Sequence, residues 1–256
     1  MRIVRATRYV TPLREGGSLP AIVEAEDCGL YVLKFRGAGQ GPLALVAELV
    51  AGEIGRVLGL KVPELVLMDL ASELGRNEPD YEIRELVLKS AGLNLALDYL
   101  PGSVMFDPAV RLPVGAVSSA VASAAVWFDA FVTNIDRTAR NPNLLWWHKT
   151  LYFIDHGASL YFHYDWNDLE RKALLPFPQI KDHVLLRWAA EIRQADAVLR
   201  PMLTEEVLTG ILAEVPDCWL SNPDEQRRGY LDYFLTRLQG QPGFVEEAAR
   251  ARDSLV

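Results

Sequence analysis

Asn134-Ile135-Asp136-Arg137-Thr138-Ala139-Arg140-Asn141-Pro142-Asn143 is the stretch of this 256-residue chain that says most about its fold. An uncharged run over residues 112–128 precedes it, and the apolar pattern predicts a long helix over residues 114–133. Two apolar runs follow, residues 144–147 and 151–154, and they predict a β-hairpin. We therefore expect a polar loop held between a buried helix and a hairpin.

Asp136, Asn141 and Asp155 are the polar residues that this arrangement brings together. Asp155 belongs to the segment Ile154-Asp155-His156-Gly157, directly after the hairpin. Phosphoryl transfer needs a carboxylate beside the attacking hydroxyl and further oxygen ligands that hold magnesium on the phosphates. An Asp and an Asn five residues apart also fit a capped, hydrogen-bonded loop, because both residues are common in turns. The hairpin and the second Asp favour phosphoryl transfer.

Lys34 stands in an apolar run over residues 30–35. A buried lysine is costly unless an anionic group meets it, and a nucleotide phosphate together with Glu48 or Glu53 would serve. The alternative is a lysine on an edge strand that reaches water. Upstream, Gly16, Gly17 and Ser18 could cover phosphates with their backbone N–H groups, although a hairpin turn explains them equally well.

The order of predicted elements gives an α+β fold with two lobes, a β-rich N-terminal lobe and a mainly helical C-terminal lobe. Strands are expected at residues 3–10, 19–24, 30–35, 64–68 and 93–99, the first three as an antiparallel meander. Helices are expected at residues 43–58, 81–89, 182–199, 205–215, 223–238 and 244–255. With a hinge at Pro101-Gly102, residues 1–99 form an N-terminal nucleotide-binding lobe and residues 100–256 a helical catalytic lobe.

Composition excludes several classes of partner. The net charge is -8, which disfavours nucleic acid and anionic membranes as partners, since both require a basic face. The 112–128 run is too short for a membrane span, and the N-terminus has no apolar signal segment. The two cysteines, Cys28 and Cys218, fit no metal or redox spacing, so we expect free thiols and a cytoplasmic protein.

Five segments of the sequence resemble the HipA-family kinases, specifically the shorter HipA-like kinase-domain proteins. They are Tyr31-Val32-Leu33-Lys34-Phe35, Ala47-Glu48 with Leu58-Gly59-Leu60-Lys61-Val62-Pro63-Glu64, Asn134-Ile135-Asp136-Arg137, Asn141-Pro142-Asn143-Leu144 and Ile154-Asp155-His156-Gly157. The resemblance spans residues 31–157 and, more loosely, most of the chain. It implies a protein-kinase-like fold that uses ATP and Mg.

The resemblance also implies roles for individual residues. Asp136 would be the catalytic base, Asn141 and Asp155 magnesium ligands, and Lys34 a contact of the ATP phosphates, with adenine near residues 98–102, at Tyr99. Glu48 matches the family's helix glutamate that pairs with the lysine. Helical phase instead favours Glu53, because it places Glu48 opposite the apolar face. We expect Glu48 and keep Glu53 as its rival.

Several positions depart from the family pattern. Thr138 replaces a histidine that many relatives have, and there is no room before Arg14 for the extra subdomain of HipA toxins, so a HipB-like partner is not expected. Residues 158–180 occupy the place of an activation loop, but no Ala-Pro-Glu anchor follows. Arg137 and Arg140 could meet a phosphate or a phosphorylated loop, but a solvated loop with helix-cap pairing is slightly favoured. The four histidines are expected to be structural or capping residues.

The acceptor stays open: a protein Ser/Thr, a small alcohol and an inositol lipid all fit. A protein Ser/Thr kinase is favoured. One alternative is a nucleotide-binding pseudokinase that acts as a regulatory module. A weaker alternative is a Zn or Mg hydrolase built around Asp155, His156 and His163.

Overall fold

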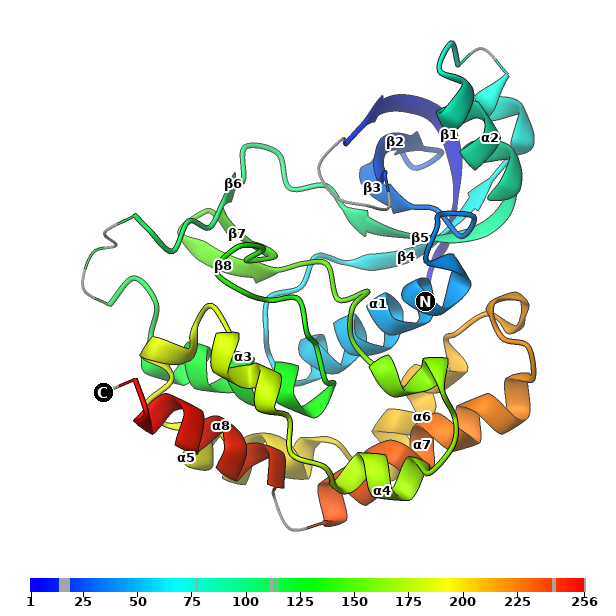
Figure 1. Ribbon diagram of the computed structural model, residues 1–256. Coiled ribbons are helices and arrows are strands. Elements are labelled where there is room, and N and C mark those ends of the chain that lie inside the picture. Colours follow the sequence, from blue (N-terminus) through cyan, green and yellow to red (C-terminus); the bar gives the residue numbers. More distant parts are fainter. Residues whose placement is uncertain (14–18, 77, 111–112, 114, 241–242, 256) are drawn as a thin grey trace.

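The computed structural model describes residues 1–13, 19–76, 78–110, 113, 115–240 and 243–255. A sheet-rich N-terminal part is followed by a mainly helical C-terminal part, which confirms the predicted α+β class (Figure 1). The turn with Gly16, Gly17 and Ser18 lies outside the described residues. Within the described residues, no helix is long and apolar enough to cross a membrane.

The N-terminal strands form a closed barrel in the order β1-β2-β3-β5-β4. Their bounds are Ile3–Pro12 for β1, Ala21–Ala25 for β2, Leu30–Lys34 for β3, Leu65–Leu70 for β4 and Gly92–Asp98 for β5. The predicted antiparallel meander of β1 to β3 is confirmed, with bounds that shift by one or two residues. The barrel closes through a parallel pairing of β1 with β4, which the sequence pattern did not predict.

Alternation along β2 and β3 explains why these residues form a barrel. Ala21, Val23 and Ala25 point inward and are buried, as are Tyr31 and Leu33. These side chains fill the barrel interior together with residues of β1, β4, β5 and α2. Because side chains alternate between the two faces of a strand, the residues between them face outward, and Lys34 follows the buried Leu33 at the end of β3.

Helix α1 (Gly41–Val57) lies between the barrel and the C-terminal helices (Figure 1). It contacts β4 and β5 on one side and α6 (Glu205–Ala213) on another. The approach to β4 is close: a Cβ atom added at Gly52 would lie 2.7 Å from Leu65 Cδ1. The helix is therefore buried on more than one face. Helix α2 (Tyr81–Lys89) has the predicted bounds and sits beside the barrel.

The hairpin after residues 134–143 is confirmed as β7 (Leu144–Trp147) and β8 (Thr150–Phe153). His148 and Lys149 form its turn, and both have positive φ, 47° and 62°. A two-residue turn with two positive φ angles matches the twist of antiparallel strands. A short strand that was not predicted, β6 (Val104–Met105), adds to β7 and completes a three-stranded sheet.

The C-terminal part is built around helix α3 (Ser119–Phe131), which is shorter than the predicted 114–133. The helix begins directly after Ser118, which caps its N-terminus because the Ser118 side chain accepts a hydrogen bond from Val121 N–H. Trp127 and Phe131 of α3 stack at 5.2 Å and meet Phe234 and Phe244. The other helices are α4 (Leu169–Leu174), α5 (Ile192–Leu199), α6, α7 (Pro223–Gln239) and α8 (Gly243–Asp253).

The predicted continuous helix over residues 182–199 is wrong. The structure has the 3-10 turns Pro178–Asp182 and Leu186–Trp188, and only then α5. The backbone around His183 is hydrogen-bonded to the loop after α3. Val184 N–H donates to Arg137 O, and His183 forms a β-bridge with Thr138. These contacts with the stretch that follows α3 replace the hydrogen bonds that a helix would need.

Two leucines of β3 provide a matched test of the barrel. Leu33 is fully buried and Leu30 is 40% exposed. We expect Leu33→Ala to lower the free energy of unfolding by about 2–5 kcal/mol, because it leaves a cavity. Leu30→Ala should cost less than about 1 kcal/mol. Urea unfolding followed by circular dichroism measures both values, and equal costs would contradict the inward orientation of Leu33.

Candidate active site

Lys34, Glu48 and Asp155 meet although they come from β3, α1 and the segment after β8. The Lys34 Nζ atom lies 2.6 Å from Glu48 Oε2 and 2.6 Å from Asp155 Oδ1. The Glu48 side chain is completely buried, and that of Asp155 is 48% exposed. β3 pairs with β2 and β5, so Lys34 is not on an edge strand and that alternative is wrong. The lysine instead bridges the sheet-rich part and the hairpin segment.

The electrostatics of this group follow from burial and close opposite charges. Burial lowers the pKa of Lys34, but the carboxylates of Asp155 and Glu48 outweigh it and raise the pKa above its ordinary value. For Glu48, burial raises the pKa, while Lys34 and the hydrogen bond from His156 lower it to about 2. Both groups are therefore charged at neutral pH, and Lys34 presents a fixed positive charge.

Glu48, and not Glu53, contacts Lys34. Glu53 lies 3.7 Å from Arg56 on its own helix. Helical phase pointed to Glu53 because it assumed one apolar face, but α1 is buried on several sides, from Leu45 through Gly52. Glu48 is therefore buried within a helix that has almost no solvent face. His156 N–H donates to the same Glu48 Oε2 atom at 2.7 Å, which ties α1 to the residue after Asp155.

Asp136 and Asn141 lie together in the loop after α3. Asn141 Nδ2 donates to Asp136 Oδ2 at 2.7 Å, and the Asp136 N–H donates to Asn134 Oδ1 at 3.1 Å. Burial raises the pKa of Asp136, and the negative charge of Asp155 adds to this, while Asn141 acts in the opposite direction. The carboxylate of Asp155 is therefore close enough to act on that of Asp136.

A buried ion pair beneath this loop was missed from the sequence. Arg137 was expected to be solvated, but its side chain is 0% exposed and its Nε atom donates to Asp129 Oδ2 at 2.6 Å. Arg137 Nη1 also donates to the carbonyl oxygens of Asn143 and Ile154, at 2.5 and 3.2 Å. The sequence feature that could have indicated this ion pair is Asp129, a charged residue within a strongly apolar helix, which needs a partner of opposite charge.

The oxygen donors fit magnesium. Because Asn141 uses its Nδ2 atom toward Asp136, its carbonyl oxygen Oδ1 is the atom that can bind a cation. This amide oxygen and the half-exposed carboxylate of Asp155 are oxygen groups of the kind that magnesium takes as ligands beside phosphates.

The structure does not support the alternative of a Zn or Mg hydrolase built around Asp155, His156 and His163. Among the described residues, no group of three or more His, Cys, Asp and Glu side chains could hold a metal ion. His163, which that alternative needs, places Nδ1 2.9 Å from the Tyr230 hydroxyl, and burial lowers its pKa to about 4.

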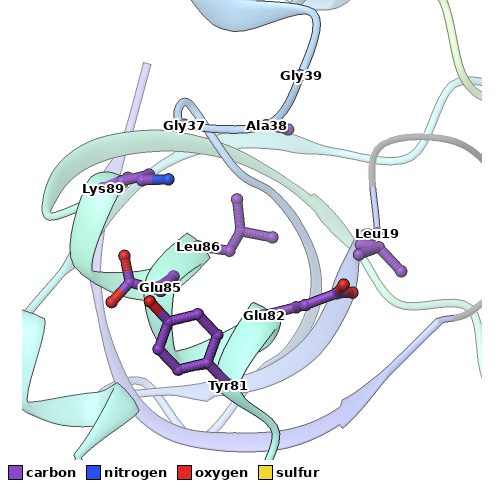
Figure 2. A pocket seen from close by; sticks show the side chains of 9 residues that line it. All are labelled: Leu19, Gly37, Ala38, Gly39, Tyr81, Glu82, Glu85, Leu86 and Lys89. Carbon is purple, nitrogen blue, oxygen red and sulfur yellow. The ribbon is translucent and has the colours of Figure 1, made fainter.

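One hollow adjoins Lys34, and a second lies on the other side of the β3–α1 segment. The smaller one, of about 30 Å³, is lined by Lys34, Asp155 and Gly157 and by residues of the β3–α1 segment. A larger one, of about 330 Å³, lies between Gly37–Gly39 and the face of α2 that carries Tyr81 and Glu85 (Figure 2). Both hollows include Ala38. The β3–α1 segment therefore separates the Lys34 group from an open surface pocket.

Tyr99, expected near adenine, follows β5 directly. Its N–H donates to Leu30 O at 3.0 Å, so its backbone continues the pairing of β5 with β3. The nearby Pro101 accepts a hydrogen bond from Trp147 Nε1 at 3.0 Å, which attaches this connection to the hairpin.

Comparisons with known proteins support this description. The family model of the HipA-like kinases matches residues 7–241. The crystal structure of the Helicobacter pylori proinflammatory kinase CtkA is similar over 97% of this chain and 98% of that chain, with a TM-score of 0.60 and 13% identity. This likeness concerns the fold alone.

More distant structures are two of the Golgi casein kinase. One of them matches with 10% identity and covers 93% of this chain and 71% of that chain. The other, with Mn/ADP bound, matches with 11% identity and covers 93% of this chain and 73% of that chain. Both have a TM-score of 0.45, and we draw nothing from them. No curated protein matches the chain. The match of the family model over most of the sequence shows that the chain belongs to the HipA-like kinase family.

Proposed function

We propose that this kinase transfers the γ-phosphate of ATP to a hydroxyl group in a magnesium-dependent reaction. The observation that carries the proposal is the convergence of Lys34, Glu48 and Asp155, with contacts of 2.6 Å on either side of the lysine. Asp136 and Asn141 complete the residue set that phosphoryl transfer uses. A protein Ser/Thr hydroxyl is the favoured acceptor.

Lys34 is the proposed phosphate contact. Its ammonium is held in place by the buried Glu48, so it offers a fixed positive charge at the edge of the small hollow. Asn141 and Asp155 would hold magnesium, which neutralises charge on the phosphates when bound. Because Lys34 lies beside Asp155, phosphate and metal would occupy neighbouring positions.

Asp136 is the proposed base. It would accept the proton of the acceptor hydroxyl while a new bond forms between that oxygen and the γ-phosphorus, and the bond from phosphorus to the leaving ADP oxygen breaks. Its backbone N–H is held by Asn134 and its carboxylate by Asn141, so its orientation is fixed before substrate arrives. Positioning of this kind accounts for much of enzymatic phosphoryl transfer.

The two-lobed arrangement is part of the proposal. Residues 1–99 would form the nucleotide-binding lobe and residues 100–256 the catalytic lobe, with adenine near Tyr99. Gly16, Gly17 and Ser18 would cover the phosphates. A cytoplasmic location, which both exposed free cysteines would suit, stays a prediction.

Asp136→Asn should lower kcat at least about 100-fold, because the amide cannot accept the proton. Asp168→Asn is a matched control, since the Asp168 side chain is 69% exposed. The assay follows transfer from γ-labelled ATP to the protein itself and to mixed protein and alcohol acceptors. Full turnover by Asp136→Asn would refute the assignment of the base. Stabilisation by ATP and magnesium without any transfer would favour the pseudokinase.

Lys34→Met should weaken the binding of magnesium ATP about 10- to 100-fold, because a charge-assisted hydrogen bond is lost. Lys149→Met, in the exposed hairpin turn, should bind ATP as the parent protein does. Isothermal titration calorimetry with a non-hydrolysable ATP analogue gives the dissociation constants. Equal affinities in the two variants would place the nucleotide away from Lys34.

A further inference from the structure

We propose that His183 is a positioning residue for the phosphotransfer site, an inference that rests on the proposed function. His183 does not belong to the catalytic loop and follows the 3-10 turn Pro178–Asp182. It reaches the loop through the buried carboxylate of Asp129, to which its Nε2 atom lies at 2.9 Å.

The hydrogen bonds of the His183 ring define its tautomer. Leu185 N–H donates to His183 Nδ1 at 3.1 Å, so Nδ1 must be an acceptor without a proton. The proton of the neutral ring is then on Nε2, which donates to Asp129 Oδ2. The side chain is 2% exposed. A fixed, buried imidazole thus adds a directed donor to a carboxylate that also binds Arg137.

Asp129 connects His183 to the loop through hydrogen bonds at both of its carboxylate oxygens. Its Oδ1 atom accepts from Asn134 Nδ2 at 2.9 Å, and Asn134 Oδ1 holds the N–H of Asp136. Its Oδ2 atom accepts from Arg137, the residue after Asp136, at 2.6 Å. Burial raises the pKa of Asp129, but Arg137 and His183 hold it well below its ordinary value. Both oxygens of one charged carboxylate are therefore used to fix the base.

The same network reaches the two proposed magnesium ligands. Arg137 Nη1 donates to the carbonyls of Asn143 and Ile154, which lie close after Asn141 and directly before Asp155. His183 also touches the loop through its backbone, because it bridges with Thr138 while Val184 N–H donates to Arg137 O. The restraint from His183 is therefore most direct at the base, and it reaches the backbone beside the proposed metal ligands only through Arg137.

The position of the network predicts which kinetic constant depends on it. It lies under Asp136, whereas Lys34 is held by Glu48 and Asp155. Loss of the His183 donor should therefore misplace the base with little change at the phosphate contact. Because a displacement of about 1 Å can cost about 100-fold in rate, the effect should fall on kcat.

The experiment compares His183→Ala, His183→Gln and His148→Ala in the full chain. We expect kcat to fall about 10- to 100-fold in His183→Ala, with KM for ATP within about twofold. Glutamine keeps a donor toward Asp129 but places no acceptor at the position of Nδ1, where Leu185 N–H donates, so His183→Gln should recover kcat to within about fivefold of the parent. His148 is exposed in the hairpin turn, and its variant should match the parent. Thermal unfolding confirms that each variant is folded.

An unchanged kcat in His183→Ala would overturn the proposal, as would a glutamine variant no better than the alanine variant. A loss confined to KM for ATP would also overturn it.

A second measurement depends neither on activity nor on a folded variant. In the parent protein at pH 8, ¹⁵N spectra of the histidine rings should show His183 with its proton on Nε2. A proton on Nδ1 would overturn the positioning role even if phosphotransfer is observed. If His183 has the predicted tautomer but no phosphotransfer is detected, the result refutes the proposed function and leaves the position of the His183 proton as predicted.

Discussion

The charged carboxylate of Asp129 in the core of the helical part is the constraint on which the site depends. Removing such a charge from water costs several kcal/mol unless close partners compensate. Arg137 supplies the opposite charge at 2.6 Å, and Asn134 and His183 supply further donors. These partners must come from the loop after α3 and from the segment near residue 183. The need to satisfy one buried charge therefore fixes how two distant segments meet, and Asp136 lies between two of the partners.

A second buried charge, Glu48, fixes the other half of the site in the same manner. Lys34 and the N–H of His156 both reach its Oε2 atom. The two centres are joined through consecutive residues, because Arg137 holds the carbonyl of Ile154 and Lys34 holds the side chain of Asp155. The segment after β8 thus connects α3 with α1 and β3. Asp155 therefore lies between the two buried charges.

Local patterns predicted the strands of the meander, the hairpin and the polar residues of the site, because each depends on neighbours in sequence. The patterns missed the features that depend on burial between segments distant in sequence. The phase of α1 suggested Glu53 because periodicity assumes one buried face, whereas this helix is buried on several. Arg137 belongs to a polar loop by sequence and to the core by its contact with Asp129. The segment around His183 has helix-compatible residues, but its backbone hydrogen-bonds to the loop after α3. The roles of the site residues come from family resemblance.

Backbone strain marks where these segments enter and leave the site. Thr133, Asn143 and Asp155 have positive φ angles of 54°, 49° and 56°. Each such residue costs on the order of 1–3 kcal/mol, and a β-branched residue such as Thr is rare there. Thr133 directly precedes Asn134, and the carbonyl of Asn143 is held by Arg137. Asp155 is held by Lys34. Asn143 and Asp155 are themselves held by the cations of the two buried ion pairs, and Thr133 adjoins Asn134, so part of the electrostatic stabilisation maintains the geometry of the site.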